Sequence, residues 1–168
     1  MTPEVRRVRL HEWELVRDLR IAAVSDPAAA LAFLTTPDQE RARDEESWRS
    51  RTARGAMADS AAQFVAVLGD RGVGSADVIL RGADAGHPFR ADIVGVWIAP
   101  DQRGRGLLAV LVDAAREWAA SRGQEAVTLS VHRDNARARA AYEKIGFAPT
   151  GVSFTSAVGP EIELRRAH

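Results

Sequence analysis

The chain has 168 residues, with 23 basic and 23 acidic side chains, and 46% of its residues are hydrophobic. These values are typical of one globular domain over residues 1–168, and they exclude extensive disorder and a collagen-like repeat. The balanced charge argues against nucleic-acid binding, and the absence of cysteine excludes disulfides, thiolate metal sites and acyl-cysteine intermediates.

Neither a bilayer-spanning segment nor a signal peptide is recognisable. The longest apolar runs have fewer than about ten residues, whereas roughly 20 are needed to cross a bilayer. Residues 1–7 lack the apolar core of a signal peptide. The sequence therefore predicts a cytoplasmic protein without membrane association.

The N-terminal half predicts three strands and two helices. A short alternating strand is expected at residues 5–10, followed by a helix at 12–24 and a charged helix at 38–54 with Trp48 as its anchor. Two strands at 63–68 and 73–80 are expected to form a hairpin around the turn Gly69-Asp70-Arg71-Gly72. Residues 82–88 are interpreted as a glycine-rich loop.

The C-terminal half alternates strands and helices. Strands are expected at 92–98 and 127–131, helices at 106–122 and 135–145, and two final strands at 148–156 and 161–165. A strand–helix–strand–helix order indicates one parallel crossover inside an otherwise antiparallel sheet. The predicted fold class is mixed α/β, with a mostly antiparallel central sheet flanked by helices.

The segment that joins the strand at 92–98 to the following helix carries the strongest chemical signal. It contains Gly104 and Gly106 beside Arg103 and Arg105. Glycines let an anion approach the backbone, and the first N–H groups of a helix are unpaired and partially positive. The segment thus predicts a phosphate or pyrophosphate site, and the alternative is a tight turn with exposed arginines.

Two common phosphate-binding motifs fit poorly. A P-loop requires Lys-Ser/Thr after its second glycine, where this chain has Leu107-Leu108. Residues 104–109 match the loose dinucleotide fingerprint, but the next strand ends at His132 without the acidic residue that binds the ribose.

A third family matches more of the chain. The run Arg103-Gly104-Arg105-Gly106 resembles the acetyl-CoA signature of the GNAT superfamily of acyl-CoA N-acyltransferases, Arg/Gln-x-x-Gly-x-Gly/Ala. About thirty residues later, residues 135–147 (NARARAAYEKIGF) are similar to the second signature of that family. The resemblance is tightest over residues 91–151, although Leu108 stands where the signature has Gly or Ala, so its side chain must point away from CoA or into the core.

The resemblance implies direct transfer of an acyl group from acetyl-CoA to an amine in a ternary complex. The thioester carbonyl would be polarised by backbone N–H groups around Val96, Trp97 and Ile98, where the central strand splays from its parallel neighbour. The residues that the resemblance assigns to CoA binding are Arg103, Gly104, Arg105, Gly106, Leu107, Leu108, Ala109 and Asn135.

The same resemblance assigns Tyr142 as the general acid that protonates the departing thiolate, and packing of its ring is the alternative. Asp92 lies where several family members place a general base, acting here through a water. Two other positions are weaker candidates for the general base. Ser130 cannot serve as a base, and His132 is interpreted as a surface residue. The histidines show no ligand spacing, so no metal is predicted.

The acceptor is not specified by the sequence. In this family its pocket would be lined by residues 28–60 and 153–160, and a small-molecule amine is slightly favoured over a protein because no concentrated acidic patch is present. The chain is expected to be a monomer or homodimer. The alternative function is a non-catalytic acyl-CoA-binding or regulatory module of the same fold.

Overall fold

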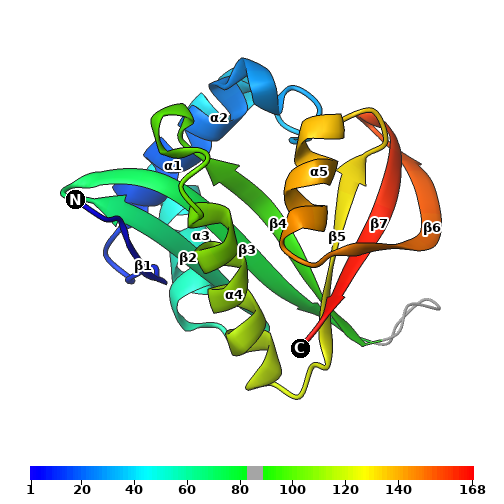
Figure 1. The fold of residues 1–168 in the computed structure, drawn as a ribbon. Coiled ribbons are helices and arrows are strands. Elements are labelled where there is room, and N and C mark those ends of the chain that lie inside the picture. Colours follow the sequence, from blue (N-terminus) through cyan, green and yellow to red (C-terminus); the bar gives the residue numbers. More distant parts are fainter. Residues whose placement is uncertain (83–88) are drawn as a thin grey trace.

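A seven-stranded sheet organises the fold (Figure 1). The computed structural model describes residues 1–82 and 89–168, so the loop predicted at 82–88 lies outside the described residues except for Gly82. The strands lie in the order β1-β2-β3-β4-β5-β7-β6. Their bounds are β1 Glu4–Arg7, β2 Ala61–Leu68, β3 Arg71–Arg81, β4 Arg90–Ile98, β5 Ala126–His132, β6 Ala148–Ser156 and β7 Gly159–Ala167.

All neighbouring strands are antiparallel except β4 and β5, which are parallel. The predicted mixed, mostly antiparallel α/β fold is therefore confirmed. The parallel pairing is short: Ala91 pairs with Val127 and Asp92 with Thr128, after which the two strands diverge (Figure 1). This divergence leaves the later residues of β4 without a ladder partner on their β5 side.

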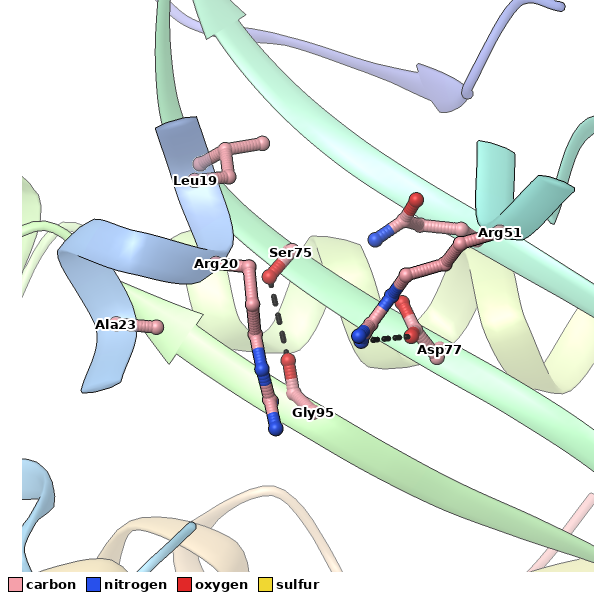
Figure 2. A pocket seen from close by; sticks show the side chains of 8 residues that line it. Leu19, Arg20, Ala23, Arg51, Ser75, Asp77 and Gly95 are labelled. Atoms are coloured by element: carbon pink, nitrogen blue, oxygen red, sulfur yellow. Dashed lines mark hydrogen bonds and ion pairs between the residues drawn. The ribbon is translucent and has the colours of Figure 1, made fainter. Parts of the chain in front are cut away.

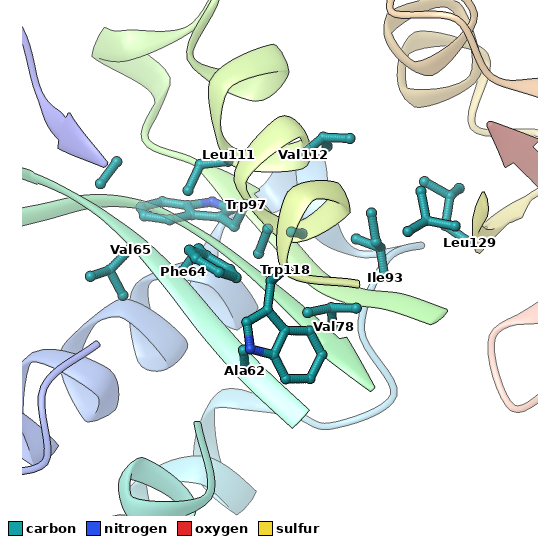
Figure 3. Packing of buried hydrophobic residues seen from close by; sticks show 14 of the residues in the cluster. Ala62, Phe64, Val65, Val78, Ile93, Trp97, Leu111, Val112, Trp118 and Leu129 are labelled. Carbon is teal, nitrogen blue, oxygen red and sulfur yellow. The ribbon is translucent and has the colours of Figure 1, made fainter. Parts of the chain in front are cut away.

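Five α-helices and two short 3-10 turns accompany the sheet in the described residues. Helix α4 (Leu107–Ala120) packs on one face, and α1 (Trp13–Ser25) and α3 (Glu45–Met57) pack on the other; α5 (Ala136–Lys144) follows β5. The core between α4 and the sheet contains Leu111 and Trp118 of α4 and Phe64, Val78 and Ile93 of the sheet (Figure 3). No helix in residues 1–82 or 89–168 has the length and apolar content needed to cross a membrane.

The helix predicted at 38–54 is wrong as a single element, because it is two helices, α2 (Pro37–Arg41) and α3. Thr36 and Gln39 form a capping box that starts α2. Asp44 caps α3 by accepting a hydrogen bond from the Ser47 N–H at 2.8 Å. Trp48 is 2% exposed and anchors α3, as predicted.

Two other predicted boundaries also move. The hairpin turn has two residues rather than four, because Leu68 pairs with Arg71, and Gly69 adopts a left-handed φ of +62°. The first strand ends at Arg7, because residues 9–12 turn back: the Glu12 N–H donates to the Arg9 carbonyl at 3.0 Å.

Candidate active site

The loop before α4 presents a row of unpaired backbone donors. The N–H groups of residues 104–109 have no acceptor within the described part of the chain. Gly104 and Gly106 have φ values of +73° and +81°, which L-residues rarely adopt. A Cβ added at either glycine would meet nothing within 4 Å, so the loop is open to a ligand. The geometry is that of an anion cradle.

The two arginines of the loop differ in their environment. The Arg103 guanidinium donates to the Ile98 carbonyl at 3.0 Å and forms an ion pair with Asp26, at the end of α1. Arg105 is exposed and has no ion pair with any described residue. Of the two arginines that the resemblance assigns to CoA binding, Arg103 is therefore neutralised by Asp26, and Arg105 is the available cation.

The apolar residues of the cradle face inward. Leu107 is buried, and Leu108 packs against the hydrophobic core. Ala109 is half-buried one residue further along α4. The Leu108 side chain therefore points into the core, one of the two orientations expected from the sequence, and leaves its own N–H accessible.

A β-bulge interrupts β4 next to the cradle. Ser75 pairs with Trp97 and Asp77 with Val94, so two β4 residues, Gly95 and Val96, lie opposite one residue of β3. Gly95 has a φ of +63°, which bends the strand where it has already left β5. Residues 96–98 thus have no described strand partner on their β5 side, and they lie directly before the cradle.

Asn135, the residue directly before α5, lies at the same edge of the sheet as the cradle. Because β4 and β5 are parallel, their carboxyl ends point the same way, and each is followed by a helix. Asn135 caps α5: its Oδ1 accepts a hydrogen bond from the Ala138 N–H at 3.2 Å. Its side-chain NH₂ group donates to no described residue and is available to a ligand.

Tyr142 lies on α5 with its ring half-buried against the core and edge-on to Phe147, at a centroid distance of 5.7 Å. Its hydroxyl makes no hydrogen bond with a described residue, and burial is the only influence on its pKa. Burial raises the pKa of Tyr142 to about 12, so the phenol stays protonated at neutral pH. The side chain can therefore donate a proton but holds no structural hydrogen bond of its own.

Asp92 is buried in an ionic network. Its carboxylate accepts from Arg81 Nε at 2.5 Å, lies 2.8 Å from Arg90 Nε, and accepts a hydrogen bond from the Thr128 hydroxyl. Arg90 also bonds Glu163 at 2.7 Å. These contacts favour a structural ion pair at the paired end of β4, and the general-base role of Asp92 stays a prediction.

The remaining candidates are His132 and the side chains that could bind a metal. His132 is 6% exposed rather than on the surface, and its Nδ1 accepts a hydrogen bond from the Asp134 N–H at 3.1 Å. In the described ranges no three His, Cys, Asp or Glu side chains come close enough together to hold a metal ion.

Sequence reasoning missed Asp77, a carboxylate in the middle of β3 (Figure 2). It lines a small cavity with Arg20, Arg51, Gln63, Ser75 and Gly95. Burial raises the pKa of Asp77 to about 6, although the positive charges of Arg51 and Arg20 act in the opposite direction. The signal in the sequence was a lone acidic residue inside an apolar strand.

Several known proteins share this fold. A structure from Streptococcus pneumoniae described as an acetyltransferase of the GNAT family has a TM-score of 0.77 at 18% identity and covers 98% of each chain. The PaiA N-acetyltransferase from Thermoplasma acidophilum, solved in complex with coenzyme A, has a TM-score of 0.71 at 14% identity and covers 100% of both chains. At these identities the likeness shows the fold alone.

Sequence comparison goes further. A mycothiol acetyltransferase from Beutenbergia cavernae is 33% identical over 88% of this chain, which spans 58% of that relative's length. Residues 27–147, which include the cradle and α5, match the acetyltransferase (GNAT) family. The chain therefore belongs to the acetyltransferase (GNAT) family.

Proposed function

We propose that this protein transfers an acetyl group from acetyl-CoA to a primary amine by direct attack within a ternary complex. The observation that carries the proposal is the row of unpaired N–H groups at residues 104–109, open to ligand and adjacent to the point where β4 and β5 diverge. A pyrophosphate in the cradle would direct the rest of CoA along the unpaired side of β4.

Apart from the ion-paired Arg103 side chain and Asp92, each predicted residue has a distinct task in this proposal. The N–H groups of residues 104–109 bind the pyrophosphate with Arg105, and the free amide NH₂ of Asn135 binds the arm of CoA. Backbone N–H groups at residues 96–98 polarise the thioester carbonyl, since the bulge and the divergence leave that strand side free. Tyr142 supplies the proton that the departing thiolate needs.

The acceptor is proposed to be a small molecule. The acidic residues before and within α2 and α3 do not form an attractive patch for a cationic protein tail. Arg20 and Arg43 neutralise Glu40, Arg49 pairs with Glu45 at 2.7 Å, and Asp44 caps α3. The negative charges of that surface are therefore interleaved with arginines and form no concentrated acidic patch.

The second candidate function is a non-catalytic acyl-CoA-binding module. One observation favours it: the carboxylate of Asp92, at the position that the resemblance gives to a base, is fully occupied by Arg81, Arg90 and Thr128. Such a module would bind acetyl-CoA as tightly but would release no thiol.

The two functions are separated by measuring free CoA thiol released from acetyl-CoA with a panel of amines. The panel contains alkylamines, amino sugars, amino acids and peptides, and, because one relative is named a mycothiol acetyltransferase, mycothiol-related amines. Amine-dependent release supports the proposed function. Binding of acetyl-CoA by calorimetry without release for any amine supports the module instead.

A further inference from the structure

The α1/α3 face of the sheet carries a cavity that the predicted machinery does not use. Its lining includes Arg20 of α1, Arg51 of α3, Gln63 of β2, Asp77 of β3 and Gly95 of β4 (Figure 2). Asp77 pairs with Gln63 on one side and with Val94 on the other, so it stands between the two strands. The cavity has room for about one water molecule.

Two buried acceptor oxygens in this cavity lack hydrogen-bond donors within the described ranges. Oδ1 of Asp77 and Oε1 of Gln63 are both buried and have no hydrogen-bond partner among the described residues. Buried oxygens are normally paired, and leaving one unpaired costs about 1–3 kcal/mol. The Gln63 side chain also acts on Asp77 as a hydrogen-bond donor. The two acceptor oxygens that lack donors indicate a site for a group that donates hydrogen bonds, such as a water.

Asp77 is close to the bulge of β4. A Cβ added at Gly95 would lie 3.4 Å from Oδ2 of Asp77, an ordinary van der Waals contact, so the carboxylate lies directly beside the bulge. The Ser75 hydroxyl donates to the Gly95 carbonyl at 3.2 Å and fixes the bulge from the same cavity. The cavity therefore adjoins the strand segment whose N–H groups would polarise the thioester.

We propose that Asp77, through one water held in this cavity, accepts the proton that the acceptor amine loses before it attacks the thioester. The inference rests on the proposed acetyl transfer and assigns the role of base to Asp77 in place of the ion-paired Asp92. Asp77 acts through the water, so it is a positioning and proton-accepting residue rather than one that touches the amine.

The proton balance is complete without another reactant. The ammonium gives one proton to the water, which passes a proton to Asp77, and the neutral amine attacks the carbonyl carbon. As the tetrahedral intermediate collapses, the C–S bond breaks, the thiolate takes a proton from Tyr142, and the nitrogen loses its second proton to solvent. Asp77 releases its proton to solvent and Tyr142 takes one back, so one proton is released per turnover.

The charges around Asp77 suit this task. Arg20 of α1 and Arg51 and Arg54 of α3 act on it electrostatically, and Arg51 Nη2 lies 3.9 Å from Oδ2. Gln63 of β2 is uncharged, and hydrogen bonding from its side chain also acts to lower the pKa of Asp77. The Gly95 segment of β4 is uncharged. Because burial outweighs these cations and raises the pKa of Asp77 to about 6, the carboxylate is ionised at pH 7 yet can still hold a proton during turnover.

The test compares pH profiles of thiol release for the wild type and Asp77→Asn, with the best amine of the panel. The wild type is expected to show an acid limb with a midpoint near pH 6. In the variant the rate should follow the fraction of neutral amine instead, rising tenfold per pH unit, and at pH 7 it should be about 10²–10⁴-fold lower. Hydroxylamine, which is largely neutral at pH 7, should reduce this difference to less than about tenfold.

Two further variants keep the test decisive. Arg51→Gln removes a cation beside Asp77, so the acid limb should move to higher pH, an effect that a merely structural ion pair would not produce. Asp92→Asn tests the rival base. The proposal is overturned if Asp92→Asn abolishes the acid limb while Asp77→Asn keeps the wild-type profile. It is also overturned if the midpoint of the acid limb stays in place in Arg51→Gln.

Failure of the proposed acetyl transfer and failure of the proposed role of Asp77 give different results. A wild-type protein that releases no thiol with any amine contradicts the proposed function, and Asp77 then has no proton to accept. An active wild type whose Asp77→Asn variant folds, binds acetyl-CoA and keeps its profile contradicts only the role of Asp77. Thermal denaturation and acetyl-CoA calorimetry of each variant distinguish these results from misfolding.

Discussion

The indole N–H of Trp97 donates a hydrogen bond to Oδ2 of Asp26 at 2.9 Å, and this joins the end of α1 to β4. The same carboxylate oxygen pairs with Arg103, at the start of the cradle. Burial opposes ionisation of Asp26, but the hydrogen bonds from Trp97, Arg103 and the Ala28 N–H outweigh it and lower its pKa. One carboxylate thus holds a helix, a strand and the cradle loop together.

We predict that Asp26→Ala destabilises the protein by about 3 kcal/mol, because it leaves the partly buried Arg103 without its partner. Acetyl-CoA affinity should fall as well, since the loop before α4 loses its attachment to α1. Denaturant unfolding and calorimetry measure the two effects. Asp18→Ala, on an exposed position of the same helix, is the control and should change neither; an unchanged acetyl-CoA affinity in Asp26→Ala would show that the attachment does not position the cradle.

A second prediction concerns the backbone of the cradle. Gly106→Val should abolish acetyl-CoA binding, because the added side chain occupies the open space through which a phosphate reaches the helix start. Gly69→Val is a matched control: Gly69 also has a positive φ and open space around it, but it lies in the β2–β3 turn. Both variants should lose about 1–2 kcal/mol of stability from backbone strain, and only Gly106→Val should lose the ligand. Normal binding by Gly106→Val would place the phosphate site elsewhere.

Ligand selectivity provides a third prediction. Acetyl-CoA should stabilise the protein in a thermal-shift experiment, and NAD should not, because β5 ends at His132 without a carboxylate for the ribose. At 100 times its dissociation constant, acetyl-CoA should add about 2.7 kcal/mol to the free energy of unfolding. Stabilisation by NAD without an effect of acetyl-CoA would contradict the assignment of the cradle.

The sequence predicted the parts of the fold that depend on local pattern. The strand–helix–strand–helix order predicted the parallel β4–β5 pair, and the two glycines before α4 predicted a special turn, which has the positive φ values of Gly104 and Gly106. Periodicity and turn chemistry are encoded over a few residues. The break between α2 and α3 was also encoded locally, in the capping residues Thr36 and Asp44, but the charged composition on both sides concealed it.

The missed features of the site depend on contacts between distant residues. Asp26 and Arg103 are 77 positions apart, and their pairing becomes visible only when α1 is packed beside β4. The cavity around Asp77 needs α1, α3 and three strands to be placed together. Such contacts decide whether an acidic side chain is a base or an ion pair, and no periodicity reports them.

A fourth prediction concerns acid stability and Glu40, which is fully buried. Its carboxylate accepts hydrogen bonds from the Thr35 hydroxyl at 2.6 Å, Arg20 at 3.0 Å and Arg43 at 2.6 Å. Burial opposes ionisation, but these bonds outweigh it and lower the pKa of Glu40 from 4.5 to about 2. The ionised carboxylate therefore contributes about 3 kcal/mol above pH 4.5, which is lost as the pH falls towards 2.

Glu40→Gln should reduce the free energy of unfolding at pH 7, and the difference from the wild type should shrink between pH 4.5 and pH 2. Glu45→Gln, in the exposed pair with Arg49, should cost less than about 1 kcal/mol at any of these pH values. Denaturant unfolding at several pH values measures both. A deficit of Glu40→Gln that stays constant with pH would mean that packing, and not the charge, stabilises this position.

The last prediction concerns Tyr142→Phe, which keeps the ring and removes only the hydroxyl. That hydroxyl has no partner among the described residues, and the edge-on contact with Phe147 remains, so stability and acetyl-CoA affinity should change little. Turnover should fall about 10²–10⁴-fold, the usual range for the loss of a positioned proton donor. The loss should be smaller with an acyl donor whose thiol is more acidic, because a stable thiolate needs no proton in the transition state. Thiol release with acetyl-CoA and with such a donor measures both effects; a Phe variant that turns over at the wild-type rate would leave Tyr142 a packing residue, with water as the acid.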